Sequence, residues 1–189
     1  MDLLSKIHNE IKFEFGSMQD ELPEQIMSAI FLTGNEKVLE LGGNIGRNSM
    51  IISYILNKNN NYDYVVLETN TDDAAKLTHN RDMNDLRFHI EPSALSNRPL
   101  IQSGWTTRIS DYVPPGFFKV NTISWNDLNT KYNIEFDTLV VDCEGAFYYI
   151  LEDFPDILNN IKLVLMENDY FDTPHHKTVV QDTLKNIGF

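Results

Sequence analysis

A glycine-rich segment that begins with an acid is the part of this sequence best suited to chemistry. It has the sequence Glu40-Leu-Gly-Gly-Asn-Ile-Gly46 and continues the short apolar run 37–41. Glycines let a ligand approach the backbone closely, and the N–H groups at the start of a following helix can face that ligand. Because ligands of open α/β sheets bind beyond the carboxyl ends of the strands, the segment predicts a cofactor loop after a first strand.

The spacing within this loop separates three kinds of ligand. A P-loop ends in Gly-Lys-Ser/Thr, whereas this loop ends in Gly46-Arg-Asn. A dinucleotide loop has Gly-x-Gly-x-x-Gly, and with Gly42 as its first glycine the other two positions hold Asn44 and Arg47. S-adenosylmethionine carries an ammonium and a sulfonium group, so an acid at the end of the first strand suits it better. The predicted cofactor-loop residues are Glu40, Gly42, Gly43, Asn44 and Gly46.

A second acid, Glu68, ends the next apolar run, 62–67, and follows Gly46 by 22 residues. A carboxylate at that place can accept hydrogen bonds from both hydroxyls of a ribose. Either acid alone could be a solvated group at a strand end, but the two acids together with the glycine spacing favour a nucleoside. The sequence therefore predicts S-adenosylmethionine as the cofactor, with a nicotinamide-dependent epimerase or reductase as an alternative.

Apolar periodicity places these acids in an α/β fold. Short apolar runs alternate with helical stripes, which follow the glycine loop and Thr71, begin at Phe147 and surround Val180. The Thr71 hydroxyl is expected to cap the helix that starts there. This alternation predicts a Rossmann-like, doubly wound and mostly parallel sheet covered by helices on both sides. The predicted strands are residues 37–41, 62–67, 86–90, 136–141 and 162–166.

Three other regions complete the predicted organisation. Residues 1–36 have two helical stripes and predict an N-terminal helical segment. We expect this segment to pack on residues 37–189, which form the cofactor-binding domain, so that the two make a single globular unit. Residues 97–127 are irregular and can include an inserted hairpin. The last strands of such a sheet are missing, so either the chain has been cut, or the insertion or a partner subunit completes the sheet edge.

Composition limits the classes of partner. The 189 residues carry a formal net charge of −13, with Lys and Arg scattered, which argues against direct binding of nucleic acid. No apolar run approaches the roughly 20 residues that span a bilayer, and the N-terminus lacks the core of a secretion signal. A single cysteine, Cys143, excludes an intrachain disulfide framework. We therefore expect a cytoplasmic protein without membrane contact.

From about Lys37 to Phe189 the chain resembles the FkbM family of methyltransferases. The family's glycine motif matches the loop through Ser49, with Gly43 in place of the usual alanine. A second match is Leu139-Val-Val-Asp-Cys-Glu-Gly-Ala146, where the family has Leu-Lys-Ile-Asp-x-Glu-Gly-Ala, so Val140 replaces a common lysine. The resemblance implies O-methylation of hydroxyls on sugars or other small metabolites.

The resemblance also assigns positions to further residues. Glu68 corresponds to the family's acid after the second strand. The stretch Ala94-Leu-Ser96 matches an Ala-Leu-Ser stretch of the family and implies that Ser93 and Ala94 lie near the adenine. Glu167 matches a glutamate at the end of the fifth strand.

Methyl transfer to a hydroxyl needs an aligned acceptor and a route for its proton. We expect Asp142 and Glu144 to be the catalytic pair, with Asp142 positioning the methionine moiety or the acceptor at the cofactor rim. Glu144 could instead cap the helix that follows it. His175 or His176 could act as a general base, or could simply lie at a solvent-facing helix start.

A few side chains near the expected rim allow more than one role. Asp142, Asn168 and Asp169 offer oxygen ligands of the kind that Mg²⁺ prefers, although we predict a reaction without a metal. Trp105 and Tyr112 could form an acceptor wall or could pack the insertion. The chain could also be a non-catalytic scaffold that keeps the fold. The preferred prediction is an S-adenosylmethionine-dependent methyltransferase that acts on a small-molecule or glycan acceptor.

Overall fold

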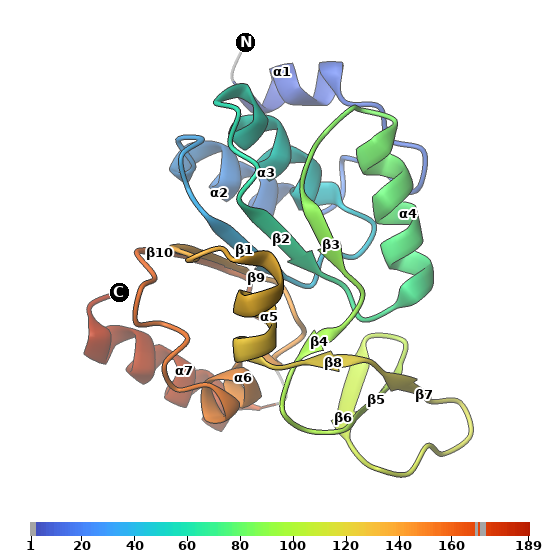
Figure 1. Ribbon diagram of the computed structural model, residues 1–189, viewed down its shortest axis with the longest axis vertical. Helices are drawn as coiled ribbons and strands as arrows, with labels where there is room; N and C mark the ends of the chain where they lie inside the picture. Colours follow the sequence, from blue (N-terminus) through green and yellow to red (C-terminus); the bar gives the residue numbers. More distant parts are fainter. Residues whose placement is uncertain (1–2, 169, 171–172) are drawn as a thin grey trace.

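The computed structural model describes residues 3–168, 170 and 173–189. Its centre is a five-stranded, fully parallel sheet in the order β10-β9-β1-β2-β3 (Figure 1). The strand order reverses between β1 and β9, so the carboxyl ends of these two strands form a topological switch point. The predicted Rossmann-like parallel sheet is thereby confirmed. The strands are β1 (Val38–Leu41), β2 (Tyr64–Leu67), β3 (His89–Glu91), β9 (Thr138–Val141) and β10 (Leu163–Met166).

Helices cover both faces of the sheet, as Figure 1 shows. Alternate strand residues point to opposite faces, so Val38 packs toward the first helix group and Leu39 toward the second. The first group comprises α1 (Leu3–Glu10), α2 (Leu22–Phe31), α3 (Arg47–Lys58) and α4 (Thr71–Asp82). The second group comprises α5 (Trp125–Tyr132), α6 (Phe147–Asp153) and α7 (Pro174–Ile187).

Two details of the predicted elements were wrong. The third strand begins at His89, later than expected, because its parallel pairing with β2 starts only at Val65 and His89. Phe88, whose ring contacts that of Tyr64, is buried just before the strand. Helix α4 is capped by the side chain of Asn70, which accepts hydrogen bonds from the backbone N–H groups of Asp72 and Asp73 at 2.9 and 3.4 Å. The expected Thr71 hydroxyl cap is therefore replaced by its neighbour.

The insertion folds into small sheets of its own. Strands β5 (Leu100–Ser103), β6 (Thr106–Ile109) and β7 (Phe118–Val120) form an antiparallel sheet in the order β6-β5-β7. Strands β4 (Ala94–Leu95) and β8 (Thr122–Ile123) form a parallel pair that connects this sheet to the rest. The expected hairpin is present as β5 and β6. The insertion does not join the main sheet, so it does not complete the edge at β10.

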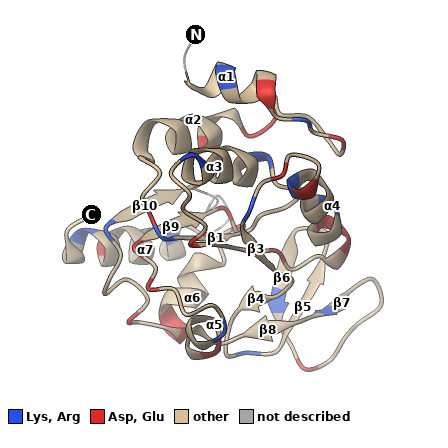
Figure 2. Cartoon of the chain, turned by 45° about the horizontal axis from the view of Figure 1, so that its top comes forward, with Lys and Arg blue, Asp and Glu red and all other residues tan. Residues whose placement is uncertain are grey.

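The N-terminal helices pack on the first helix layer. Ile7 of α1 is fully buried in the core cluster that contains Ile51 of α3. Helix α2 packs against both α3 and β10 and so covers one edge of the sheet. Lys and Arg are scattered over the chain in Figure 2 and form no continuous stripe. No helix in the described part of the chain is long and apolar enough to cross a membrane.

Leu77 of α4 is expected to support the glycine loop. Its side chain is fully buried and its two methyl groups lie against Gly43 and Gly46. Truncation to alanine leaves a cavity under the loop, so Leu77→Ala should lower the free energy of unfolding by about 2–5 kcal/mol in urea titrations. The matched control is Ile30→Ala, because Ile30 is 67% exposed and its truncation should change stability by less than about 0.5 kcal/mol. Equal effects of the two variants would contradict this account.

Candidate functional site

A cavity of about 730 Å³ lies beyond the carboxyl ends of the sheet strands. Its size falls in the usual range for small-molecule sites, and its position is that of ligands in doubly wound sheets. Every strand of the main sheet contributes to the wall through the residues that follow or end it. Of the predicted site residues, those on the wall are Gly42, Asn44, Glu68, Ser93, Ala94, Asp142 and Glu144.

The remaining predicted residues, Glu40, Gly43 and Gly46, do not line the cavity, and the two glycines face the sheet and α4 instead. A Cβ atom on Gly43 would lie 2.2 Å from Cγ1 of Val66, and one on Gly46 would lie 2.3 Å from Cδ1 of Leu77. These glycines let the loop rest directly on the sheet and on α4. Direct contact of Glu40, Gly43 and Gly46 with a cofactor stays a prediction.

Gly42 brings the ends of two strands together. Its φ of +92° is in the left-handed region, and a Cβ there would lie 1.7 Å from the carbonyl oxygen of Asp142. The backbone N–H of Asp142 in turn donates to the carbonyl of Leu41 at 2.9 Å. The loops after β1 and β9 therefore touch, and this contact places the glycine motif beside the Asp142–Glu144 motif.

Glu40 is a buried carboxyl that fastens β1 to its neighbours. Only 2% of the residue is exposed, and its Oε2 accepts hydrogen bonds from the Ser49 hydroxyl at 2.6 Å and from the Tyr64 hydroxyl. Burial raises the pKa of Glu40 to about 7, although both hydrogen bonds act to lower it. The acid that begins the glycine motif thus ties the first strand to α3 and β2.

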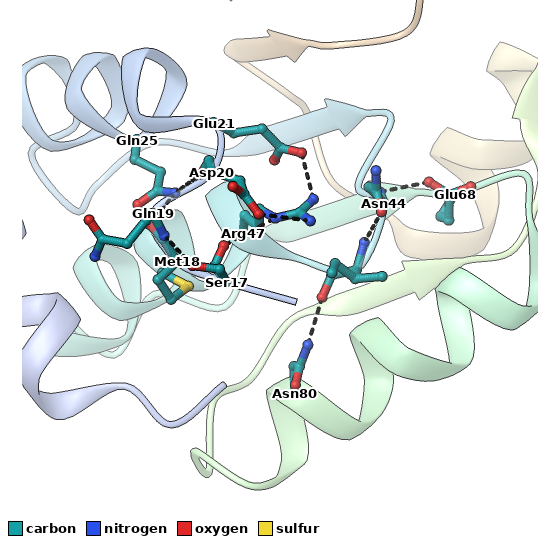
Figure 3. Close-up of polar contacts among 11 residues, drawn as sticks. Ser17, Met18, Gln19, Asp20, Glu21, Gln25, Asn44, Arg47, Glu68 and Asn80 are labelled. Carbon is teal, nitrogen blue, oxygen red and sulfur yellow. Dashed lines mark hydrogen bonds and ion pairs between the residues drawn. The ribbon is translucent and has the colours of Figure 1, made fainter. Parts of the chain in front are cut away.

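Glu68 fixes the outer side of the same loop (Figure 3). One oxygen accepts from the backbone N–H of Asn44 at 2.7 Å and the other from the backbone N–H of Asn70 at 2.7 Å. Burial raises the pKa of Glu68, and these hydrogen bonds only partly offset that effect. The Thr69 hydroxyl also donates to the oxygen that Asn70 uses, at 3.4 Å. A carboxylate has about four acceptor positions, so Oε2, which among the described residues accepts only from Asn44, keeps one for a ligand hydroxyl.

Asn44 itself has a left-handed backbone, with φ of 46°, and its side-chain oxygen accepts from the N–H of Ile45 at 2.8 Å.

Ser93 lies just beyond β3, the edge strand of the sheet, and its hydroxyl donates to Oε1 of Glu91 at 3.0 Å. Burial raises the pKa of Glu91, but hydrogen bonds from Lys131, Tyr132 and Ser93 outweigh this and lower it overall. Ser93 is therefore anchored on a charged carboxylate.

The residues after β9 present carboxylates to the cavity. Asp142 is half-buried, and Glu144 is exposed with a left-handed backbone, φ 51°. Burial and the nearby charge of Glu167 raise the pKa of Glu144. The N-cap of α6 is Ala146, so Glu144 does not occupy the cap position that was considered for it.

The charge of the wall is strongly negative. Seven carboxylates line the cavity against two guanidinium groups, those of Arg98 and Arg108. Such a surface favours a cationic ligand and disfavours a pyrophosphate. The carboxylates are Glu21, Glu68, Asp73, Asp142, Glu144, Asp153 and Glu167.

The insertion closes the cavity on the side away from the glycine loop. Arg98 is held by Asp153 of α6 at 2.6 Å and by Glu152 at 3.0 Å, which ties the insertion to the second helix layer. Trp105 lines the cavity, although it is 72% exposed, whereas Tyr112 does not. Gln102 also lines it, and its buried Oε1 accepts no hydrogen bond from the described residues.

The two histidines at the start of α7 differ. His176 lines the cavity and stacks on Tyr148, with ring centroids 3.8 Å apart and planes 4° apart. His175 is exposed and does not line it. Of the pair considered from the sequence, His176 is the one placed to reach a ligand.

The candidate magnesium set is only partly described. Asp169 lies outside the described residues, so its geometry with Asp142 and Asn168 is not defined. In the described ranges no group of three His, Cys, Asp or Glu side chains could hold a metal ion.

Glu21 and the Arg98–Asp153 pair are among the contributors to the cavity that sequence reasoning missed. Glu21 comes from the N-terminal segment, outside the motif-bearing part of the chain, and no local pattern singles it out. The Arg98–Asp153 pair joins residues 55 positions apart, and only folding brings them together.

Comparison with known proteins shows the fold. No protein-family model matches the chain, and no curated protein matches it. A protein from Klebsiella pneumoniae assigned as an O-methyltransferase superposes with a TM-score of 0.52 at 11% identity, over 98% of this chain and 77% of that one. A precorrin 8W decarboxylase from Methanobacterium thermoautotrophicum gives 0.51 at 11% identity, over 96% and 80% of the respective chains.

At these identities the likeness concerns the fold alone, and the two neighbours carry different activities in their names. The chain therefore shares the α/β fold of these two neighbours, and nearly the whole chain, with its N-terminal helices, lies within the matched region.

The buried position of Glu40 predicts a pH-dependent stability. Its pKa in the folded chain, about 7, lies above the ordinary value, so the folded state holds a proton that the unfolded chain has released between about pH 4.5 and pH 7. The free energy of unfolding should therefore fall as pH rises through this window. Glu40→Gln cannot titrate, so the stability difference between the variant and the parent should shift in favour of the variant by about 2–3 kcal/mol from pH 5 to pH 8.

Urea unfolding of both chains at the two pH values measures this shift. Other acids with raised pKa values contribute equally to both chains and cancel in the difference. A difference that does not change with pH would show that Glu40 is charged in the folded protein throughout.

Proposed function

We propose that this chain is an S-adenosylmethionine-dependent O-methyltransferase that acts on a hydroxyl of a small molecule or glycan. One observation carries the proposal. A glycine loop and the Glu68 carboxylate meet at an acid-lined cavity, at the switch point of a parallel sheet. The sulfonium of the cofactor supplies an electrophilic methyl group. The residues of the chain bind the cofactor, orient the acceptor hydroxyl and remove its proton.

The wall of the cavity fits the parts of such a cofactor. Glu68 follows β2, and its Oε2 keeps an acceptor position for one ribose hydroxyl, while the second hydroxyl can replace the long bond from Thr69 at Oε1. Ser93 and Ala94 follow β3 and lie on the wall where an adenine next to that ribose would extend. The positive sulfonium group matches the negative charge around Asp142 and Glu144, and the ammonium group matches the excess of carboxylates over guanidinium groups on the wall as a whole.

A nicotinamide cofactor fits this cavity less well. A dinucleotide places its pyrophosphate against a helix N-terminus and needs glycines where this chain has Asn44 and Arg47. An excess of five carboxylates over guanidinium groups on the wall would also repel it. Neither of these features opposes a cationic sulfonium nucleoside.

The acceptor is proposed to lie between the insertion and helices α6 and α7. There Gln102, Trp105 and His176 line the cavity on the side away from the glycine loop. In this arrangement Asp142 and Glu144 stand at the rim shared by cofactor and acceptor, and we assign to them the alignment of the reacting groups. Asp142 and His176 are the candidates for removing the acceptor's proton.

The FkbM-type assignment and the cytoplasmic location belong to the same proposal. The FkbM-type assignment rests on the two sequence motifs, and the cytoplasmic location rests on the single cysteine. Val140, which replaces the lysine common in that family, is buried in β9 against the first helix layer. A side chain at that position faces the core, so the replacement leaves the cavity wall unchanged.

Binding and turnover measurements test the proposal. Calorimetry with S-adenosylhomocysteine should show binding, whereas NAD should not bind at the same concentrations. A labelled methyl donor incubated with a panel of hydroxylated sugars and phenols should then give a labelled product. Binding without any transfer would support the scaffold alternative, and preference for NAD would overturn the proposal.

Glu68 provides the sharpest residue-level prediction. Glu68→Ala and Glu68→Gln should weaken S-adenosylhomocysteine binding by about 1–3 kcal/mol, because charge-assisted hydrogen bonds to the ribose are lost. The same loss should appear with 5′-methylthioadenosine, which keeps the ribose. Glu135→Ala, an exposed carboxylate away from the cavity, serves as the control. Unchanged affinity in both Glu68 variants would remove Glu68 from the ribose site.

A further inference from the structure

A short N-terminal segment, residues 16–21, lies against the start of α3 and reaches the cavity. Arg47, the first residue of α3, binds this segment at three points (Figure 3). Its Nη1 lies 2.7 Å from Oε1 of Glu21, its Nη2 lies 3.5 Å from Asp20, and its Nε donates to the carbonyl of Ser17 at 3.2 Å. The residue that follows the glycine loop thus holds a segment from outside the sheet domain.

A buried glutamine fixes the same segment from the other side. Gln25 of α2 is fully buried, and its Nε2 donates to the carbonyls of Met18 and Asp20 at 3.2 and 2.7 Å. Its Oε1 lies 2.6 Å from Nε2 of His8. The position of Glu21 is therefore set by contacts on both sides.

Glu21 is the member of this segment that lines the cavity. Its side chain is 28% exposed, against 60% for the neighbouring Asp20, which also pairs with Arg47. Arg47 occupies Oε1 of Glu21, and no described residue donates a hydrogen bond to Oε2. One carboxylate oxygen is therefore free to bind a ligand.

The location of Glu21 corresponds to one end of a bound nucleoside. Burial raises the pKa of Glu21, although the pairing with Arg47 lowers it. The charges of Glu24 and Glu167 add to the rise. Glu21 immediately precedes α2, and α2 packs against β10, so Glu21 lies toward the β10 end of the sheet. Glu68 follows β2 and Ser93 follows β3, on the other side of β1. A ligand with its ribose at Glu68 and its base toward Ser93 extends its remaining end toward Glu21.

We propose that the Glu21 carboxylate binds the ammonium group of the cofactor's amino-acid end, with Arg47 positioning it. The inference rests on the proposed function, because it assumes a cofactor of the S-adenosylmethionine type. It assigns a binding residue to the N-terminal helical segment, which the sequence motifs leave without a role. The segment then covers the amino-acid end of the site as well as completing the core.

Two ligands that share the nucleoside test this assignment. S-adenosylhomocysteine carries the amino-acid end, and 5′-methylthioadenosine lacks it. Glu21→Gln should weaken the first by about 10-fold or more and leave the second unchanged, since a charge-assisted hydrogen bond is lost only where the ammonium is present. Glu24→Gln is the matched control, because Glu24 lies in the first turn of the same helix but does not line the cavity.

Each outcome of the calorimetry has one meaning. Equal weakening of both ligands would show that Glu21 acts only on the fold of the segment and would overturn the proposal, as would no weakening of either. If the parent chain binds S-adenosylhomocysteine, the proposed cofactor stands whatever Glu21→Gln does. If the parent binds neither ligand, the proposed function fails and the inference fails with it.

Thermal unfolding checks that each variant is folded. If Glu21→Gln does not fold, Glu21→Asn replaces it, because asparagine tolerates the left-handed backbone of this position, φ 58°. The same selective loss of S-adenosylhomocysteine binding is expected from it. Equal loss of both ligands would overturn the proposal here too.

Discussion

The contact between the loops after β1 and β9 is the constraint on which the site depends. Gly42 lies against the carbonyl of Asp142 at a distance that leaves no room for a side chain. The two strands are neighbours at the switch point, so their loops diverge to opposite faces and leave a crevice between them. This contact brings two motifs, separated by about a hundred residues, to the same cavity.

Two acids hold the glycine loop in place from different sides. Glu40 lies beneath it and joins β1 to Ser49 and Tyr64, whereas Glu68 lies at the wall and accepts from the loop backbone at Asn44. Both are buried, and burial raises both pKa values. Keeping carboxyl groups in such places costs stability, and their hydrogen bonds offset part of that cost. The sequence predicts cofactor contact for both acids, whereas in the structure Glu68 lines the cavity and Glu40 does not.

The N-terminal segment and the insertion both contribute residues to the wall of the cavity, the first through Glu21 and the second through residues of 98–109. The sheet end supplies the glycine loop and the strand-end acids, which many proteins with this architecture could share. Arg47 fastens the N-terminal segment at one end of the cavity, and Arg98 fastens the insertion to Asp153 at the other. Under the proposed function, selectivity for a particular acceptor is therefore expected to depend on the N-terminal segment and the insertion rather than on the sheet.

The sequence alone determined the alternation of strands and helices, the glycine loop after the first strand and the acid that ends the second, because these depend on patterns within about 20 neighbouring residues. Only the tertiary structure decided which side of the loop Glu40 occupies and that Asn70 rather than Thr71 caps α4. It alone also placed Glu21 on the cavity wall. The physical reason is that burial and ion pairing depend on residues far apart in the chain, and no local period encodes which of them will meet.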